Sequence, residues 1–147
     1  MNLVFLLVAF FGMEFVAWFA HKYVMHGVLW VLHKDHHVKE SKSFFERNDF
    51  FFLLFATPGM ILIYLGFNYP ELNYLFWLGL GIALYGFAYF MVHDVFIHQR
   101  FKFLRKTDNR YFRAVRRAHK MHHKHITKED GECFGMLLFP FKYLKQQ

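Results

Sequence analysis

Three long apolar runs constrain the fold of this chain more than any other feature of its sequence. They cover Leu3–Ala20, Phe50–Phe67 and Tyr74–Val92. Each has about 18 residues or more, the length that an α-helix needs to cross the hydrocarbon core of a bilayer. The short polar segment Asn68–Asn73 joins the second run to the third and predicts a helical hairpin. The sequence therefore predicts an all-α, integral membrane helical bundle with three transmembrane helices, at about residues 3–20, 50–67 and 74–92.

Two other interpretations of the apolar runs fit less well. A signal peptide carries basic residues before its apolar stretch and small residues at its cleavage site, but the first run has neither. A soluble protein of 147 residues has too little polar surface to cover three helices that are apolar all round. By its length, the chain is expected to form a single domain over residues 1–147.

The positive charges are distributed unevenly along the chain. Of the 18 Lys and Arg residues, five lie in residues 21–49 and the other thirteen in residues 93–147. With three spans, these two segments lie on the same side of the membrane, and the positive-inside rule makes that side cytoplasmic. We therefore expect the N-terminus outside and the C-terminus in the cytoplasm. This topology explains the net charge of +7 without a nucleic-acid partner.

Composition narrows the remaining possibilities. Hydrophobic residues make up 56% of the chain, which excludes a disordered protein. Cys133 is the single cysteine, so an intrachain disulfide, a cysteine-based zinc module and an iron–sulfur cluster are excluded. The C-terminal stretch Phe134–Leu144 is apolar but too short to span, and we expect it to lie in the membrane interface or to fold back against the bundle.

Ten of the eleven histidines follow a spacing pattern that occurs twice. Each copy has an HxxxxH pair followed by an HxxHH box, with an interval of six residues in the first copy and twenty in the second. The ten histidines are His21, His26, His33, His36, His37, His93, His98, His119, His122 and His123. His21 ends the first span and His93 ends the third, so the pattern predicts one helical, histidine-rich cap at the cytoplasmic face.

The two spacings have different consequences on a helix. The three histidines of an HxxHH box are three and four residues apart, so they face the same way and can present imidazoles to a metal. The two histidines of an HxxxxH pair lie about 140° apart on a regular α-helix. That pair converges only if two helix faces line one cavity or if the helix is distorted near its end.

A metal explains why so many imidazoles are gathered in one place. Ten neutral imidazoles are costly to desolvate without partners, and they repel one another when protonated. Imidazole suits iron, zinc, copper or nickel. Two metals with about six coordination positions each accommodate the ten histidines, some of which can instead support the ligands. The eleventh, His125, is interpreted as solvated or supporting rather than as a ligand.

Three carboxylates are candidates for supporting the imidazoles. Glu14 lies seven residues before His21, on the same helix face within about 20°, and a carboxylate inside a span is expensive and usually functional. We expect Glu14 to face the bundle interior and pair with a histidine or with a polar group of another span. Asp35 and Asp94 adjoin histidines and are candidates to accept their outer N–H groups. The weaker candidates are Glu46, Asn48 and Asp49.

A basic stripe precedes the last histidine box at helical spacing. Its members are Arg110, Arg113, Arg116, Arg117 and Lys120. Contact with anionic lipid headgroups explains such a stripe next to a membrane. A docking surface for an acidic protein partner is the second interpretation, and the two are compatible.

At this point the sequence resembles the bacterial β-carotene hydroxylases, within the fatty acid hydroxylase and sterol desaturase superfamily of membrane di-iron enzymes. The resemblance runs from Met13-Glu14 to Pro140. The stretches that carry it are HKYVMHGVLWVLHKDHH (21–37), FERNDFFFLLFA (45–56), YGFAYFMVHDVFIHQR (85–100), RRAHKMHH (116–123) and CFGMLLFP (133–140).

The resemblance implies a location, a reaction and a ligand set. The location is the bacterial inner membrane. The reaction inserts a hydroxyl at C3 of each β-ionone ring and converts β-carotene through β-cryptoxanthin to zeaxanthin. The cofactors are two non-haem irons, which zinc can replace in purified protein, together with O2 and electrons from reduced ferredoxin or a similar donor. The partners are a carotenoid within the bilayer, an acidic ferredoxin-type donor and membrane lipids, and the ten histidines of the pattern become the iron ligands.

Other functions stay open from the residues alone. A lipid or sterol hydroxylase or desaturase of the same superfamily would use the same histidine pattern. A membrane haem protein needs facing histidines deeper in paired spans, and a transporter needs polar groups near the bilayer midplane. The histidines of this chain lie at the ends of the spans, which disfavours both of these non-enzymatic alternatives.

Overall fold

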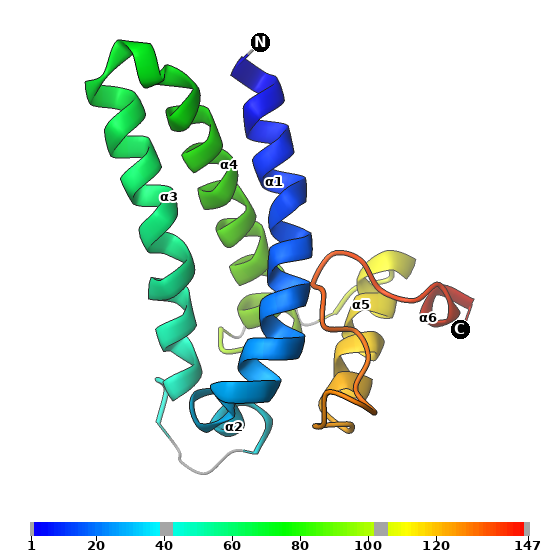
Figure 1. Cartoon of the computed structure of the whole chain (residues 1–147). Coiled ribbons are helices and arrows are strands. Elements are labelled where there is room, and N and C mark those ends of the chain that lie inside the picture. The colour runs from blue at the N-terminus through cyan, green and yellow to red at the C-terminus, as the bar shows by residue number, and fades with distance from the viewer. Residues whose placement is uncertain (1, 39–42, 102–105, 146–147) are drawn as a thin grey trace.

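The computed structural model describes residues 2–38, 43–101 and 106–145, and all regular structure in them is helical. Three long helices, α1 (Asn2–Phe19), α3 (Phe50–Asn68) and α4 (Asn73–Phe90), run side by side (Figure 1). Their bounds lie within two residues of the predicted spans. With the segments that continue them, all three are long and apolar enough to cross a membrane. The predicted all-α membrane bundle is confirmed.

The predicted hairpin is formed by α3 and α4, joined by a short 3₁₀ turn at Pro70–Leu72. Glycines allow the backbones to approach closely. A Cβ added to Gly66 of α3 would lie 2.1 Å from the backbone nitrogen of Phe76 in α4. A Cβ added to Gly81 of α4 would lie 2.4 Å from the carbonyl oxygen of Leu6 in α1. Helix α4 therefore packs against both α1 and α3.

Two of the long helices end in π-helical segments. Ala20–Val28 continues α1, and Met91–Ile97 continues α4. Their backbone hydrogen bonds join residues five apart, as from the His98 N–H to the His93 carbonyl (2.9 Å). The first segment leaves helical geometry at Gly27 (φ −117°, ψ −115°), where the chain turns away from the bundle.

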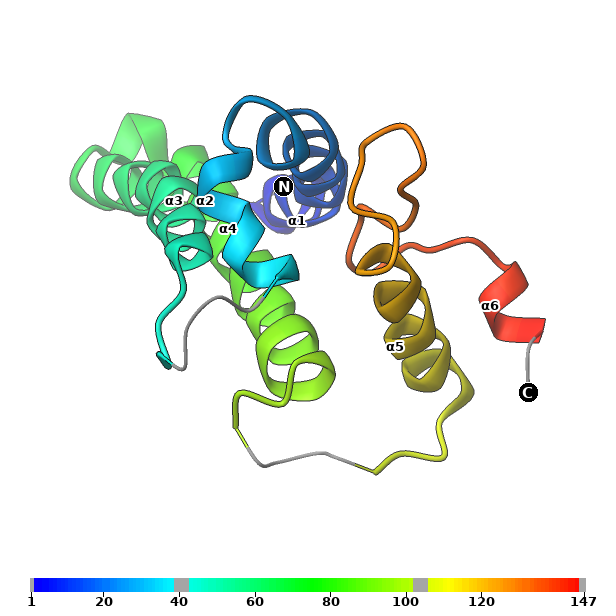
Figure 2. The same cartoon turned by 90° about the horizontal axis from the view of Figure 1, so that it is seen from below.

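The remaining helices cap one end of the bundle. Helix α2 (Trp30–His37) follows the turn at Gly27, and α5 (Arg110–His122) lies beside the end of α1 that leads into α2 (Figures 1 and 2). The Asn109 side chain caps α5 by accepting the N–H groups of Tyr111 and Phe112. The short helix α6 (Lys142–Lys145) buries Tyr143 against Ala114 and Ala118 of α5.

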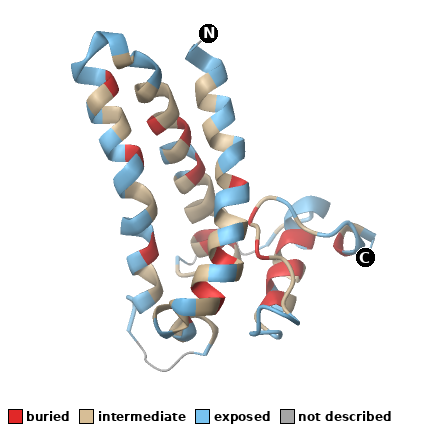
Figure 3. Cartoon of the chain, viewed as in Figure 1, coloured by how far each residue is buried: buried red, intermediate tan, exposed pale blue. Residues whose placement is uncertain are grey.

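Burial is concentrated at the capped end (Figure 3). The outer faces of the long helices expose large apolar side chains such as Phe11 (67%) and Phe52 (64%), as expected of lipid-facing surfaces. At the capped end, seven polar or charged residues are buried, namely Glu14, His21, His26, His33, His93, His119 and His122. The molecule buries imidazoles where a soluble protein of this size buries aliphatic side chains.

Candidate metal centre

Nine of the ten patterned histidines converge into two groups that could each hold a metal ion. Within each group, one ring nitrogen per residue lies within 4.8 Å of the others. The first histidine group is His21, His26, His33, His37 and His122. The second histidine group is His36, His93, His98 and His119. The helical, histidine-rich cap predicted from the sequence is present, and its members come from two π-helical segments and two α-helices.

The π-helical segments explain the HxxxxH spacing. A hydrogen bond from residue i+5 to residue i places those two residues above one another, so a pair that would diverge on an α-helix converges here. The rings of His21 and His26 have centroids 5.1 Å apart. Those of His93 and His98 lie 4.5 Å apart. Of the two possibilities that the sequence left open, helix distortion is the one that the structure shows.

Each HxxHH box is divided between the two groups. Helix α2 contributes His33 and His37 to the first histidine group and His36 to the second. Helix α5 sends His122 to the first and His119 to the second. The three imidazoles of a box lie on one helix face, as the spacing predicts, and that face borders both groups. The tenth histidine, His123, has its Nε2 2.9 Å from the Nε2 of His119 and so adjoins the second group.

The separations between ring nitrogens fit a first-row metal. In the first group, the Nε2 of His33 lies 3.0 Å from the Nε2 of His21 and 3.0 Å from that of His37. In the second, the Nε2 of His119 lies 2.9 Å from that of His98. Two imidazole nitrogens bound at about 2.0–2.1 Å and at right angles lie about 3 Å apart. The spacing therefore matches neighbouring ligands around one ion.

The surroundings keep the imidazoles neutral, which is the form that binds metal. Burial, together with the neighbouring imidazoles, lowers the pKa of His33 to about 3 and that of His123 to about 4. The pKa values of His36 and His119 are well below the ordinary range for the same two reasons, burial first. The cluster is therefore a set of unprotonated donors at neutral pH.

In the first histidine group, neutral oxygens accept the outer N–H groups. The Nδ1 atoms of His21, His26 and His122 donate to the carbonyl oxygens of residues 134 (2.9 Å), 126 (2.7 Å) and 132 (3.0 Å). His33 Nδ1 donates to the Asn48 amide oxygen at 2.6 Å. Because these oxygens can only accept, they fix the proton on Nδ1 and leave the Nε2 lone pair facing the group.

In the second histidine group, carboxylates take the same role. His93 Nδ1 donates to Asp94 Oδ2 at 3.1 Å, and His36 Nδ1 donates to Glu46 Oε2 at 3.0 Å. Asp94 thus occupies the position expected from the sequence. Burial raises the pKa of Glu46, although Arg100 opposes that shift.

Of two further sequence-based candidates, Asp35 differs from the expectation and His125 agrees with it. Asp35 Oδ2 accepts the backbone N–H of Arg47 at 2.6 Å, so this carboxylate orders the chain before α3 where an imidazole contact was expected. The other carboxylate oxygen of Asp35, Oδ1, is buried without a hydrogen-bond partner among the described residues. His125 is exposed, in agreement with the solvated interpretation.

Glu14 faces the bundle interior and pairs with a polar group of another span, as expected. Its Oε2 accepts the Tyr85 hydroxyl of α4 at 2.6 Å. Its Oε1 accepts the backbone N–H groups of residues 136, 137 and 138 at 2.8–2.9 Å. The carboxylate therefore anchors the C-terminal segment to α1, and this segment also carries the Phe134 carbonyl that holds His21. Of the two placements expected for Phe134–Leu144, folding back is confirmed.

The basic stripe on α5 divides into two parts. Arg110, Arg113 and Lys120 are exposed. The Arg116 guanidinium lies 4.1 Å from the centre of the Phe96 ring and donates to the Phe96 carbonyl. Arg117 donates to the Tyr143 carbonyl at 2.7 Å. The two half-buried arginines therefore hold α5 to its neighbours, and three exposed positions remain as a surface.

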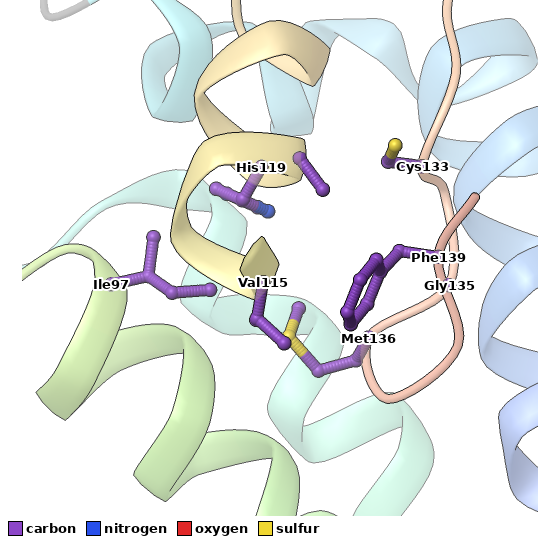
Figure 4. Close-up of a pocket in the computed structure, with 8 residues that line it drawn as sticks. Ile97, Val115, His119, Cys133, Gly135, Met136 and Phe139 are labelled. Atoms are coloured by element: carbon purple, nitrogen blue, oxygen red, sulfur yellow. The ribbon is translucent and has the colours of Figure 1, made fainter. Parts of the chain in front are cut away.

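A small pocket adjoins the second histidine group (Figure 4). It lies between α5 and the segment that Glu14 anchors, and its walls are mainly apolar. Its lining residues are Ile97, Val115, Ala118, His119, Cys133, Gly135, Met136 and Phe139. The imidazole of His119 is the polar group in this lining.

The outer hydrogen-bond partners are the part of the site that the sequence indicated least well. Glu46 and Asn48 stood out only as polar residues in front of an apolar run, which is a weak signal. Three further acceptors are backbone carbonyls, for which side-chain identity carries no information. Arg100, which binds Asp49 and Asp94, was not singled out at all.

The comparisons with known proteins agree with this geometry. The family model described as fatty acid hydroxylase matches residues 6–143. A β-carotene hydroxylase of Pantoea ananas is 41% identical over 95% of this chain and 78% of its own length. A β-carotene hydroxylase of Pseudescherichia vulneris is 36% identical over 92% of this chain and 76% of its own length.

Plant relatives are longer. The chloroplastic β-carotene hydroxylase 1 of Capsicum annuum is 39% identical over 88% of this chain, which corresponds to 41% of the plant protein. No solved structure matches the chain significantly. The family model covers nearly all of the residues, including every histidine of both groups and Glu14. The chain therefore belongs to the fatty acid hydroxylase family.

Proposed function

We propose that this protein is a membrane carotenoid hydroxylase that inserts a hydroxyl at C3 of the β-ionone rings, converting β-carotene through β-cryptoxanthin to zeaxanthin. The observation that carries the proposal is the pair of histidine groups at one end of three membrane-length helices. The substrate class rests on the relatives, which are named β-carotene hydroxylases and are 35–41% identical to this chain.

Two irons are the metals that this site is proposed to hold. The first histidine group would hold one, and the second group, with His123 beside it, would hold the other. When bound, the irons supply the O2-dependent oxidising power that an unactivated C–H bond requires, with two electrons entering from a donor of the reduced-ferredoxin type. The protein contributes neutral imidazoles, fixed tautomers and an environment from which water is excluded.

The position of the site suits a lipid-soluble substrate. The histidine groups lie where the long helices end, so one ring of a rod-shaped carotenoid in the bilayer can reach them. The apolar walls beside His119 keep that side of the second group dry. We place the histidine end in the cytoplasm and the hairpin turn outside, in the bacterial inner membrane, because all 18 Lys and Arg residues then lie on the inner side.

The exposed part of the stripe, Arg110, Arg113 and Lys120, is proposed to contact anionic headgroups or an acidic electron donor. Contact with headgroups requires exposed positive charge close to the membrane surface, and docking of an electron donor requires it close to the second histidine group. Helix α5 meets both requirements, because it also carries His119.

The test is pigment chromatography of cells that accumulate β-carotene, with and without this gene. We expect new β-cryptoxanthin and zeaxanthin only with the gene, and their loss in the His122→Ala variant. The matched control is His125→Ala, a histidine three residues away that is exposed and outside both groups.

Unchanged β-carotene contradicts the carotenoid assignment if the protein is present in the membrane and a reduced donor is supplied. In that case the lipids and sterols of the same membranes are examined for added hydroxyl groups or double bonds. Their appearance would support the lipid or sterol hydroxylase or desaturase interpretation.

A further inference from the structure

The two histidine groups differ in the charge of the atoms behind their ligands. In the first group, the four outer acceptors are three backbone carbonyls and the Asn48 amide, all of them neutral. The Nδ1 of His37, the fifth member, is buried without a hydrogen-bond partner among the described residues. No carboxylate in the described part of the chain accepts an Nδ1 proton from the first group.

Nearby carboxylates are used elsewhere. Glu132 supplies its backbone carbonyl to His122, but its side chain accepts from Lys142 at 2.6 Å and from the Tyr143 hydroxyl. Glu14 is occupied by Tyr85 and by three backbone N–H groups. These two carboxylates are therefore not available to the imidazoles of the first histidine group, because they already accept other hydrogen bonds.

In the second group, two of the four members donate to carboxylates, His93 to Asp94 and His36 to Glu46. These carboxylates are part of a fixed network. Arg100 binds Asp49 through both of its terminal nitrogens (2.7 and 2.8 Å) and Asp94 through one (2.9 Å). The Asp49 side chain also accepts the backbone N–H of Glu46 at 3.1 Å.

Formal charge makes the contrast larger. Glu46, Asp49 and Asp94 contribute three negative charges, and Arg100 contributes one positive charge, so this network carries a net charge of −2 beside the second group. The Asp49 and Asp94 side chains are partly exposed, at 29% and 15%, so solvent weakens their field without removing it. The four outer acceptors of the first group carry no charge.

A carboxylate behind an imidazole makes that imidazole a stronger electron donor than a carbonyl does. The carboxylate draws the Nδ1 proton towards itself, raises the basicity of Nε2 and stabilises additional positive charge on a bound metal. Such outer hydrogen bonds and local charge are among the means by which proteins set the reduction potential of an iron site.

We infer that the two centres are electronically unequal, and that the carboxylate-backed second histidine group holds the more oxidised iron when the pair carries one ferrous and one ferric ion. Glu46 and Asp94 are then positioning residues that act through His36 and His93. This inference rests on the two-iron site proposed above and adds an order of oxidation to it.

The test is a redox titration of the iron-loaded, full-length protein in lipid nanodiscs, followed by electron paramagnetic resonance, without substrate or turnover. In the unaltered protein we expect two separate one-electron steps. Glu46→Gln and Asp94→Asn should each shift the lower-potential step to a more positive potential and leave the other step in place. Asn48→Asp should shift the higher-potential step to a more negative potential, because it places a carboxylate behind His33 of the first group.

The matched control is Glu129→Gln, which removes one negative charge from an exposed side chain and should move neither step. Two bound irons with equal potentials would overturn the inference and leave the two-iron site standing. So would Asp94→Asn and Asn48→Asp shifting the same step. Fewer than two irons per chain would instead overturn the two-iron site, and the inference with it. Glu46→Gln and Asp94→Asn break separate contacts, so a folding defect in one leaves the other as the test.

Discussion

The hairpin end and the histidine end of the bundle are held together by different interactions. At the hairpin end, glycines bring backbones into contact, as Gly66 does against Phe76, and the stabilising force is close packing. At the histidine end, buried imidazoles and carboxylates are joined by specific hydrogen bonds. Packing needs no ligand, whereas a cluster of buried donors gains stability when a metal binds. The hairpin end should therefore be indifferent to metal, and the histidine end should become more stable with it.

The largest effect is expected from removing a buried ligand at the histidine end. His33 and His122 have exposed fractions of 1% and 0%, and each belongs to the first histidine group. Replacing either with alanine should reduce pigment conversion to background and lower the iron content, because a proposed metal ligand is lost. Circular dichroism should show the helices largely retained. Iron content near that of the unaltered protein in both variants would contradict the ligand assignment.

Acidification should strongly destabilise the metal-free protein. The folded pKa values of His33 (about 3) and His123 (about 4) lie below the unfolded value of about 6.5. Between those values the unfolded chain binds more protons, so the free energy of unfolding falls as pH falls. At pH 5 the expected cost is about 2 kcal/mol for each of these two histidines.

The measurement is the melting temperature of the metal-free protein between pH 8 and pH 5. It should be nearly constant above about pH 7 and fall below it. Iron-loaded protein should resist acid further, because bound metal competes with protons for the same nitrogens. A melting temperature that rises on acidification would contradict the neutral cluster.

A glycine substitution tests the hairpin end. Gly66→Ala places a methyl group 2.1 Å from the Phe76 backbone nitrogen, so α3 and α4 must separate. We expect a loss of about 1–3 kcal/mol in the free energy of unfolding and an unchanged iron content per folded molecule. The control is Gly86→Ala in α4, where a Cβ meets nothing within 4 Å. It should be neutral or stabilising by up to about 1 kcal/mol. A Gly66→Ala protein as stable as the Gly86→Ala protein would refute the close contact.

Glu14 joins α1 to α4 and to the C-terminal segment, and its substitution should affect both stability and metal binding. Tyr85→Phe removes one hydrogen bond to the carboxylate and should cost about 0.5–1.5 kcal/mol. Glu14→Gln weakens four hydrogen bonds and should cost more. Because the anchored segment holds His21 through the Phe134 carbonyl, Glu14→Gln should also lower iron affinity, whereas Tyr85→Phe should not. Equal iron affinity in the two variants would show that the anchor does not reach His21.

The smallest effect is expected from the basic stripe. Arg117→Gln breaks a contact to the Tyr143 carbonyl and should cost up to about 1 kcal/mol in the free energy of unfolding. Arg113→Gln should leave the melting temperature unchanged, because the side chain is exposed, and should weaken the salt-dependent association with anionic vesicles or an acidic donor. A loss of stability in Arg113→Gln together with weaker association in Arg117→Gln would contradict the division of the stripe into a packed part and an exposed part.

The difference between the long helices and the histidine end also explains which features the sequence could predict. The bounds of α1, α3 and α4 were predicted to within two residues, because the length of a span is set by the bilayer and each residue contributes independently to hydropathy. The gathering of the histidines followed from their spacing and from the ends of the spans. The division of each HxxHH box between two groups did not, because it depends on the relative rotation of α2 and α5.

The outer partners were less predictable for a related reason. The Phe134 carbonyl reaches His21 only after Glu14 has anchored a segment about 120 residues later in the chain. Every residue has a backbone carbonyl, so residue identity does not indicate which carbonyl accepts a histidine N–H. Asp35 shows the converse, since a carboxylate inside a histidine box accepts an amide from the following loop. Proximity in sequence is a poor guide to a hydrogen bond when three elements meet at one point.

The division of each histidine box has a consequence for how the protein is made. The first histidine group needs His122, and the second needs His36 from a segment made much earlier. A nascent chain that has inserted its three spans but not yet released α5 possesses neither complete group. Metal uptake should therefore be the last event in biogenesis and report that synthesis has finished. A truncated chain would reach the membrane with its three spans but without a complete histidine group.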